Sequence, residues 1–432
     1  LRTLGSLRLT VFLLAASLVL VFFGTLDQMT LGINEVQRRY FESLLVFYPQ
    51  PMIRIGLPGI YWGGILPIPG GYLLGSLLMV NLISAHWMYF KPQWKKLGIS
   101  LIHGGVLLLI LSAFVNSFVQ RESNMAITEG EAVNYSFTQR KNELVFSKSS
   151  ENADIERKEV RIPFERLKKG EALSDEALPV VVEIDHVHAN ANLYPDASKQ
   201  MLRQLPGSYK SSANRGAAAR MNIAVRPRRK DFSQEAINTA TAVVTLKTKN
   251  GETLGTWLVS NVFNSQQVPP QTFSLEGETW SVKLRFKRYY KDYWVRLNDV
   301  THDVYPGTET PKNFSSDITI TPNEGGATSR DALIYMNHPL RYEGLTYYQS
   351  GVNNTRGNTP GTEGTVLQVV RNPGWQLPYV AVLIVGIGML YQFLSSLWIY
   401  GRRRGKSSKR AATPAGQKPA VSTSGQKPAV ST

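Results

Sequence analysis

Four long apolar runs alternate with polar stretches along this 432-residue chain. The runs cover residues 9–26, 72–90, 98–119 and 377–400, and each is close to the roughly 20 residues that a helix needs to cross a bilayer. A long polar segment separates the third run from the fourth. This pattern predicts a membrane protein with three transmembrane helices near the N-terminus and one near the C-terminus.

The polar segment at 120–376 contains many short runs of alternating or β-branched residues, separated by Gly, Pro and Asn. Such runs are typical of antiparallel strands. We expect strands at 179–186, 241–248, 278–286, 346–349 and 365–370. The predicted fold class is therefore α+β, with four transmembrane helices and a large antiparallel β-sandwich-like domain. Within it, residues 199–222 are basic and rich in small residues, which indicates a mobile loop or connector.

A second polar stretch, at 27–71, separates the first two apolar runs. Over 33–47 an apolar or aromatic residue recurs every three or four positions, at Ile33, Val36, Tyr40, Leu44 and Phe47. This spacing predicts an amphipathic helix, which either lies along the membrane surface or packs as an ordinary helix. The sequence I-L-P-I-P-G-G at 65–71 would end any such helix.

Basic residues gather beside the apolar runs, and the formal net charge is +16. Arg2 and Arg8, the loop at 91–96 and the run at 402–410 all lie on the cytoplasmic side by the positive-inside rule. The predicted parts are a first helix in 1–26 with a short cytoplasmic N-terminus, an extracytoplasmic segment at 27–71, two helices in 72–119, an extracytoplasmic domain at 120–376, a fourth helix at 377–400 and a basic, disordered tail at 401–432. The first run lacks an A-x-A-like cleavage site, so we expect a retained helix rather than a signal peptide.

The chain has no cysteine, which excludes a disulfide, a thiolate metal site, a cysteine nucleophile and a C-x-x-C-H haem attachment site. No nucleic-acid-binding module is visible, and membrane topology explains the terminal basic clusters more simply than a nucleic-acid partner does. Neither a nucleophile elbow, a Walker loop, a zinc-protease helix nor a dinucleotide fingerprint occurs.

The third apolar run contains one ionisable residue, His103, followed by Gly104 and Gly105. An imidazole in hydrocarbon is costly, so it needs a partner or a task. Haem iron needs only one or two axial ligands and an apolar slot, which makes His103 a candidate axial haem ligand and the two glycines a candidate approach for the ring. His86 ends the second run and could lie at a similar depth. A hydrogen bond across helices is the alternative role for either histidine.

The histidines of the polar domain are weaker candidates. His186 and His188 alternate along a predicted strand, so they share a face that either binds a metal or is simply polar. His302 and His338 are isolated, and we interpret them as structural. Four aromatic residues form a patch that either packs in the core or faces a partner. They are Tyr289, Tyr290, Tyr293 and Trp294.

Several segments, in order, resemble the ResB family of System II cytochrome c biogenesis proteins. They are F-F-G-T-L-D-Q at 22–28, P-G-G-Y-L-L-G and V-N-L-I-S-A-H within 69–86, I-H-G-G at 102–105, E-S-N-M-A-I-T-E-G-E at 122–131, V-Y-P-G-T-E-T-P-K-N-F-S-S at 304–316, M-N-H-P-L-R-Y-E-G-L-T-Y-Y-Q-S at 336–350 and N-P-G-W at 372–375. Asn337, Pro339, Tyr342, Gly344 and Gln349 match family positions, and their spacing suits a turn and a strand.

The resemblance implies a subunit of a cytochrome c synthase in the bacterial inner membrane, paired with a ResC/CcsA-type protein. Non-covalent haem b would cross the membrane and meet apocytochrome c on the periplasmic side, where its vinyl groups form thioethers with C-x-x-C-H cysteines. His103 matches the family's haem ligand in the third membrane helix. The second membrane ligand and the external haem histidines would belong to the partner, which leaves His86 as a local hypothesis.

The partner's tryptophan-rich W-x-W-D motif does not occur in this chain, so the resemblance implies an incomplete synthase whose haem-handling motif lies on the partner. Two alternatives stay open. One is a ResB-like scaffold subunit of another membrane complex, without haem transport. The other is a binding protein whose basic outer domain captures an acidic partner.

Overall fold

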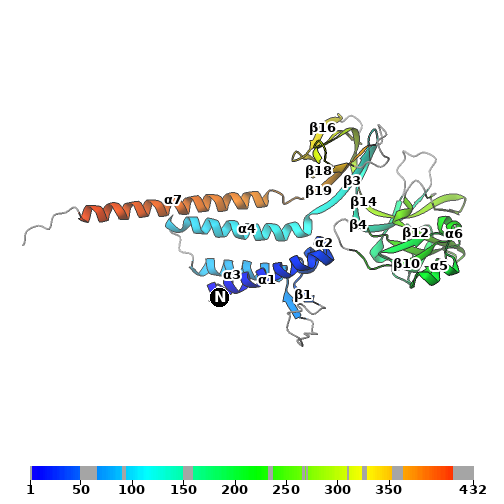
Figure 1. Ribbon diagram of the computed structural model, residues 1–432, viewed down its shortest axis with the longest axis horizontal. Helices are drawn as coiled ribbons and strands as arrows, with labels where there is room; N and C mark the ends of the chain where they lie inside the picture. Colours follow the sequence, from blue (N-terminus) through cyan, green and yellow to red (C-terminus); the bar gives the residue numbers. More distant parts are fainter. Residues whose placement is uncertain are drawn as a thin grey trace, which may run out of the picture. The chain divides into compact units, whose positions relative to one another are not determined.

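The computed structural model describes residues 2–48, 66–89, 94–148, 159–231, 237–264, 268, 271–308, 311–323, 328–352 and 363–411 (Figure 1). Four helices in these ranges are long and apolar enough to cross a membrane. They are α1 (Leu7–Leu31), α3 (Gly71–Tyr89), α4 (Leu97–Val119) and α7 (Leu377–Ala411). The four predicted helices are thereby confirmed.

One predicted boundary needs correction, and one predicted loop is described only in part. Helix α7 continues to Ala411, so the first part of the predicted disordered tail is helical, and 412–432 lie outside the described residues. The predicted basic loop at 91–96 includes a 3-10 turn at Trp94–Lys96, while its first three positions lie outside the described residues.

Helices α4 and α7 contact each other through their backbones. A Cβ placed on Gly98 would lie 2.8 Å from the Gly388 carbonyl oxygen, and one on Gly105 would lie 2.9 Å from the Ala381 carbonyl oxygen. Gly98 and Gly105 are seven residues apart, as are Ala381 and Gly388, so each pair lies on one helix face two turns apart. Small residues of this kind let membrane helices approach closely.

Helices α1 and α3 are joined by a buried amide. The Nδ2 of Asn81 donates to the carbonyl oxygens of Leu4 (2.5 Å) and Ser6 (3.3 Å), and its Oδ1 accepts from the Thr10 hydroxyl (2.7 Å). Because Asn81 is 2 % exposed and both ends of its amide are paired, the polar group is accommodated in an otherwise apolar contact.

The predicted amphipathic helix over 33–47 is only partly right. A short helix α2 (Ile33–Val36) and a π-helical turn (Gln37–Phe41) are followed by strand β1 (Leu45–Tyr48), which pairs antiparallel with β2 (Leu66–Pro69). The helical part ends where the fully buried Tyr40 donates its hydroxyl to Asp27 (2.7 Å). Strand pairing then buries Val46 against β2, so Leu44 and Phe47 do not continue a helical stripe.

The β-rich part begins directly after α4 and is antiparallel throughout its described strands. Its largest sheet has the order β16-β15-β14-β4-β3-β19-β18-β17, with β13 on β14 and β5 on β4. These strands are β3 (Arg121–Thr128), β4 (Ala132–Lys148), β5 (Glu159–Pro163), β13 (Thr272–Leu275), β14 (Glu278–Val304), β15 (Pro311–Pro322), β16 (Arg330–Tyr335), β17 (Leu340–Tyr342), β18 (Leu345–Val352) and β19 (Gly364–Arg371).

A second sheet has the order β12-β11-β7-β6. Its strands are β6 (Ala172–Leu173), β7 (Val181–His188), β11 (Thr241–Lys247) and β12 (Thr253–Ser260). All five strands expected from the sequence are therefore present, as parts of β7, β11, β14, β18 and β19.

The described strands of the β-rich part enclose two large apolar cores, and a smaller cluster lies where residues 191–225 pack on β11 and β12. The first lies between the second sheet and one end of the large sheet, as in a sandwich, and includes Phe146, Ile184, Val244 and Leu284. The second is enclosed by the large sheet alone, because β15 and β18 approach each other and the Ser316 hydroxyl donates to Gln349 (2.7 Å). The long strands β4 and β14 run through both cores.

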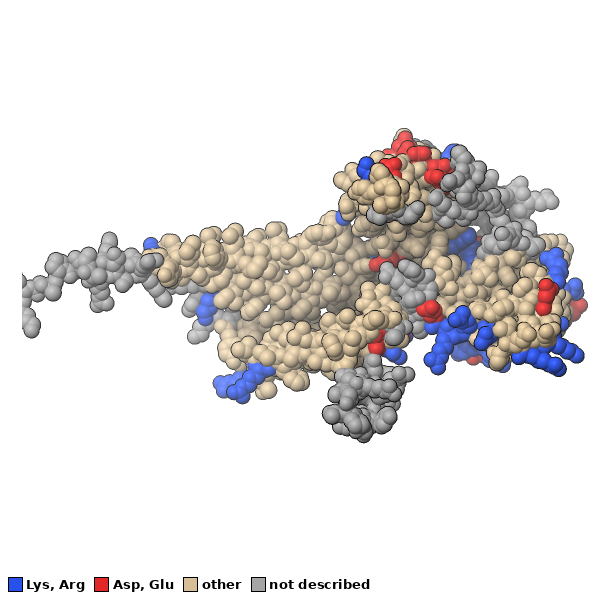
Figure 2. All heavy atoms as spheres, in the orientation of Figure 1, with Lys and Arg blue, Asp and Glu red and all other residues tan. Residues whose placement is uncertain are grey.

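The predicted mobile loop at 199–222 is a packed substructure. It contains α5 (Lys199–Gln204), β9 (Tyr209–Lys210) and α6 (Gly216–Met221), and it joins β8 (Ala191–Tyr194) and β10 (Ala224–Pro227) in a three-stranded sheet. Its small residues serve packing, because Ala217 and Ala218 are 2 % exposed. Figure 2 shows basic side chains on this part of the molecule, whereas the helix surfaces in view carry few charges.

We expect Gly98→Ala to destabilise the helical part by about 1–3 kcal/mol, since overpacking a close contact has that cost. The added methyl meets backbone atoms of α7, which cannot move aside as a side chain could. Gly386→Ala is the matched control, because nothing lies within 4 Å of a Cβ there. The measurement is thermal unfolding of both variants in detergent, and equal midpoints would contradict the close contact.

Candidate functional site

The structure brings His86 and His103 together. Their ring centroids are 6.0 Å apart and the ring planes are inclined by 81°. His86 lies near the end of α3 and His103 in the second turn of α4. Because only a short connection joins these helices, they run as antiparallel neighbours, and the two imidazoles fall at a similar level. Both side chains are half-buried.

The two glycines after His103 differ in their surroundings. A Cβ on Gly104 would have no atom within 4 Å, so space is open there. Gly105 is buried, and a Cβ on it would meet Val385 and Ala381 of α7. The sequence analysis expected both glycines to make room for a flat ring. Only Gly104 has open space beside it, whereas Gly105 packs against α7.

The groups that could bind a metal ion at His86 and His103 are their two imidazoles. Helices α3 and α4 contain no aspartate, glutamate, lysine or arginine, so neither a hard cation nor a proton relay with acidic groups is favoured. Among the residues that the structure describes, no group of three or more His, Asp and Glu side chains could hold an ion. An imidazole in an apolar helix, such as that of His103, fits an axial position of haem iron.

The four histidines of the β-rich part each lie against an aromatic ring, and for His186 and His188 that ring comes from a neighbouring sheet. His188 Nε2 lies 2.9 Å from the Tyr209 hydroxyl, and His186 lies 4.7 Å from the Tyr209 ring. Burial lowers the pKa of both histidines and raises the pKa of Tyr209 to about 12. His302 stacks on Phe314 and His338 on Tyr335.

The aromatic patch at 289–294 is divided between core and surface. Tyr293 is 5 % exposed and shares a hydrogen bond with the Tyr347 hydroxyl in the second core. Tyr290 and Trp294 are 40 % and 43 % exposed. The Arg121 guanidinium lies over the Tyr289 ring at 5.0 Å. Core packing therefore explains only Tyr293.

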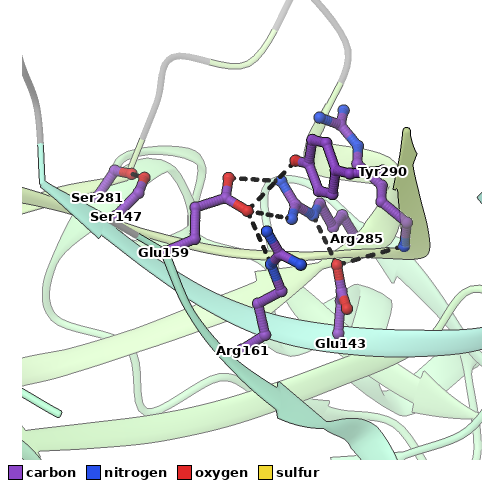
Figure 3. A network of polar contacts seen from close by, with 8 residues as sticks. Glu143, Ser147, Glu159, Arg161, Ser281, Arg285 and Tyr290 are labelled. Carbon is purple, nitrogen blue, oxygen red and sulfur yellow. Dashed lines mark hydrogen bonds and ion pairs between the residues drawn. The ribbon is translucent and has the colours of Figure 1, made fainter. Parts of the chain in front are cut away.

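A buried ionic network, which the sequence analysis missed, ties β5 to β4 and β14 (Figure 3). Arg285 donates to Glu143 (3.0 Å) and bidentately to Glu159 (2.9 and 2.6 Å). Arg161 and Tyr290 also donate to Glu159, at 3.1 and 3.3 Å. The three side chains of Arg285, Glu143 and Glu159 are 4–7 % exposed. Since every carboxylate here is engaged, the network is structural. No local pattern in the sequence points to it, because Glu143 and Arg285 are distant in the chain and meet only when β4 pairs with β14.

The network controls the ionisation of Glu159. Burial alone would raise the pKa of its carboxyl, but the hydrogen bonds and charges of Arg285 and Arg161 outweigh burial and lower it to about 2. The same contacts raise the pKa of Arg285 against the opposing effect of burial. The ion pair therefore persists well below neutral pH.

A buried lysine lies where the two cores meet. Strand β14 leaves the register of β4 between Tyr290 and Val295, and in this irregularity Lys291 is 9 % exposed. Its ammonium donates to the Ser136 hydroxyl (2.9 Å), which in turn accepts from Ser123 (2.9 Å). Burial lowers the pKa of Lys291 to about 8.

Comparison with known proteins connects the β-rich part to one family. Residues 271–362 match the sequence model of the ResB-like family. The chain is 33 % identical over 101 residues to the cytochrome c biogenesis protein CcsB of Crocosphaera subtropica, which is 23 % of this chain and 20 % of that protein. It is 28 % identical over 142 residues to CcsB of Trichormus variabilis, covering 31 % and 28 % of the two chains. Against Ccs1 of Pyropia yezoensis the identity is 31 % over 149 residues, covering 33 % and 30 %.

The match thus spans less than a third of these relatives' length. The family-matched residues run from the segment before β13 to the segment after β18. They include two segments that carried the resemblance in the sequence, at 304–316 and 336–350. His86 and His103 lie outside them, so the family match leaves the role of the histidine pair as a prediction.

We expect Glu159→Gln to cost about 3–5 kcal/mol at neutral pH, because it leaves Arg285 as a buried charge with one partner fewer. The pKa of Glu159 is lower in the folded than in the unfolded state, so the wild-type advantage is complete above the unfolded pKa of about 4.3. It is lost as the pH falls from there towards 2. Urea unfolding of the variant and the wild type between pH 7 and 3 checks this; a difference independent of pH would contradict it.

Lys291→Met should stabilise the β-rich part at pH 7, because it removes a buried cation while keeping the volume. The folded-state pKa of about 8 lies below the unfolded value of about 10.4. Wild-type stability therefore rises with pH between these values, and the advantage of the variant shrinks over the same window. Unfolding midpoints at pH 7, 8.5 and 10 measure it; an advantage that grew with pH would contradict this account of Lys291.

Proposed function

We propose that this ResB-like chain acts in cytochrome c biogenesis, as one subunit of a membrane-bound cytochrome c synthase. The observation that carries the proposal is the His103 imidazole. It lies in a helix without charged residues, beside open space at Gly104, in a chain whose outer strands match the ResB-like family. A polar group in such a helix is a functional-site hypothesis by default.

The four helices place the chain in a lipid bilayer in this proposal. Their exposed side chains include Leu18, Phe22, Val382 and Phe393, which suit contact with hydrocarbon. The basic residues beside the helices orient them with Arg8 and Lys96 on the cytoplasmic side. The β-rich part is then periplasmic, and the membrane is the inner membrane of a bacterium.

Haem b is the substrate that passes through the complex, and it supplies the vinyl groups to which apocytochrome cysteines add. His103 holds the iron on one side during passage. Gly104 leaves room for the ring, and the apolar flanks of α3 and α4 keep water away from it. A ResC/CcsA-type partner provides the outer haem-handling residues, and the β-rich part helps to form the space in which apocytochrome c docks.

We expect His103→Gly to lower the haem that co-purifies with the chain and its partner by at least about tenfold, because even outer contacts of a metal ligand are worth 10–100-fold. Added imidazole should restore part of the loss by filling the vacated position. The matched control is His302→Gly, which removes a histidine of the outer domain. Haem is measured from the absorption spectrum of the purified complex.

Two results would contradict the proposal at different levels. Unchanged haem in His103→Gly would remove the ligand assignment. A wild-type complex that carries no haem under any loading condition would favour the scaffold function instead.

A further inference from the structure

We infer that residues 191–231, which pack on the second sheet, form a docking surface for a protein partner rich in aspartate and glutamate. This segment, the basic subdomain, comprises β8, β9, β10, α5 and α6. The surface involves neither His103 nor haem, so the inference goes beyond the proposed function.

The basic subdomain holds nearly half of the net charge of the chain in about a tenth of its length. Its 41 residues contain nine basic and two acidic side chains, a formal net charge of +7, compared with +16 for all 432 residues. Figure 2 shows basic side chains over this part of the molecule. Like charges at this density repel one another and oppose compact folding. Bound negative charge would relieve that repulsion.

Six of the nine basic residues are arginines, and the fold leaves them without carboxylate partners. Among the residues that the structure describes, none of the six forms an ion pair, whereas the buried Arg285 pairs with two carboxylates. The guanidinium group binds carboxylates bidentately, and arginine is enriched in protein interfaces. Five of the six are exposed, and Arg226 is half-buried. The six are Arg203, Arg215, Arg220, Arg226, Arg228 and Arg229.

The surroundings of Tyr194 show that this surface favours negative charge. Asn192 of β8 lies opposite Arg226 of β10, and Tyr194 is two residues further along β8, on the same face. The Asn192 amide nitrogen donates to the Tyr194 hydroxyl (3.0 Å). This hydrogen bond, together with the guanidinium groups of Arg226 and Arg228, lowers the pKa of Tyr194 against the opposing effect of burial. A carboxylate of a partner would bring its negative charge to the same donors.

The basic subdomain presents its charges from a packed scaffold without exposed apolar anchors. Val225 packs with Val243 and Leu258 of the second sheet, and the Ser198 hydroxyl caps α5 by accepting from the Met201 amide (3.1 Å). No large hydrophobic side chain of residues 191–231, all of which the structure describes, is exposed. Segments that bind a lipid surface insert such side chains. An acidic protein therefore suits this surface better than an anionic membrane does.

The test uses the full chain in non-ionic detergent, with fluorescently labelled polyglutamate as the acidic probe and fluorescence anisotropy as the readout. The wild-type chain should bind the probe with an affinity that falls steeply as salt rises. The combined substitution Arg203→Glu, Arg228→Glu and Arg229→Glu should lower the affinity at low salt about tenfold or more, because it places like charges against the probe. Replacing the same three arginines by Gln, which adds no repulsion, should lower it less.

The matched control changes the net charge equally on exposed positions of β4 and β15. It is Arg140→Glu, Lys141→Glu and Lys312→Glu, and it should bind polyglutamate nearly as tightly as the wild type. An equal loss in the control would show that net charge alone holds the probe, and would overturn the inference. Absence of binding by the wild-type chain would do the same.

A second probe, a short-chain phosphatidylglycerol, separates a lipid from a protein partner. If the arginine substitutions weaken binding of this lipid but leave polyglutamate binding unchanged, the surface binds lipid headgroups and the inference is wrong. The haem content of the same samples should not change in any variant. Failure of the docking surface is therefore distinguishable from failure of the haem assignment at His103.

Discussion

The cost of an imidazole in hydrocarbon is the constraint on which the account depends. A polar side chain within a membrane helix needs a partner, because water is not there to solvate it. His103 meets this condition by facing His86 on the neighbouring helix. Neither helix offers a carboxylate, so imidazole nitrogen is the donor on which the proposed haem ligation rests. The haem hypothesis follows from this donor set together with the ResB-like strands.

The backbone contact between α4 and α7 gives the helix that carries His103 a fixed support. Gly98 and Gly105 press α4 against α7 on one face, while His103 and the open position at Gly104 lie on others. A helix held this closely presents its remaining faces in a defined orientation, which is what a ligand for an iron centre requires. The same contact joins α7 to α4, although the whole β-rich part separates these two helices in the chain.

The sequence predicted those features that depend on local pattern. Hydropathy located all four helices, and alternation located strands such as β7 and β11, because burial of one face determines these patterns. The sequence predicted a continuous helix over 33–47 and missed its end near Tyr40. The hydrogen-bond partner of Tyr40, Asp27, and the strand that pairs with β1 both lie outside that segment. The role of Gly105 depends on α7, more than 270 residues later, and single-sequence patterns contain no record of such contacts.

The most direct measurement is a density map of the chain with the proposed ResC/CcsA-type partner, after loading with haem, at a resolution that shows side chains. The account predicts a flat tetrapyrrole whose iron is bound by the His103 imidazole of α4. Density that shows only lipid or packed side chains around His103, with haem bound elsewhere or not at all, would contradict it.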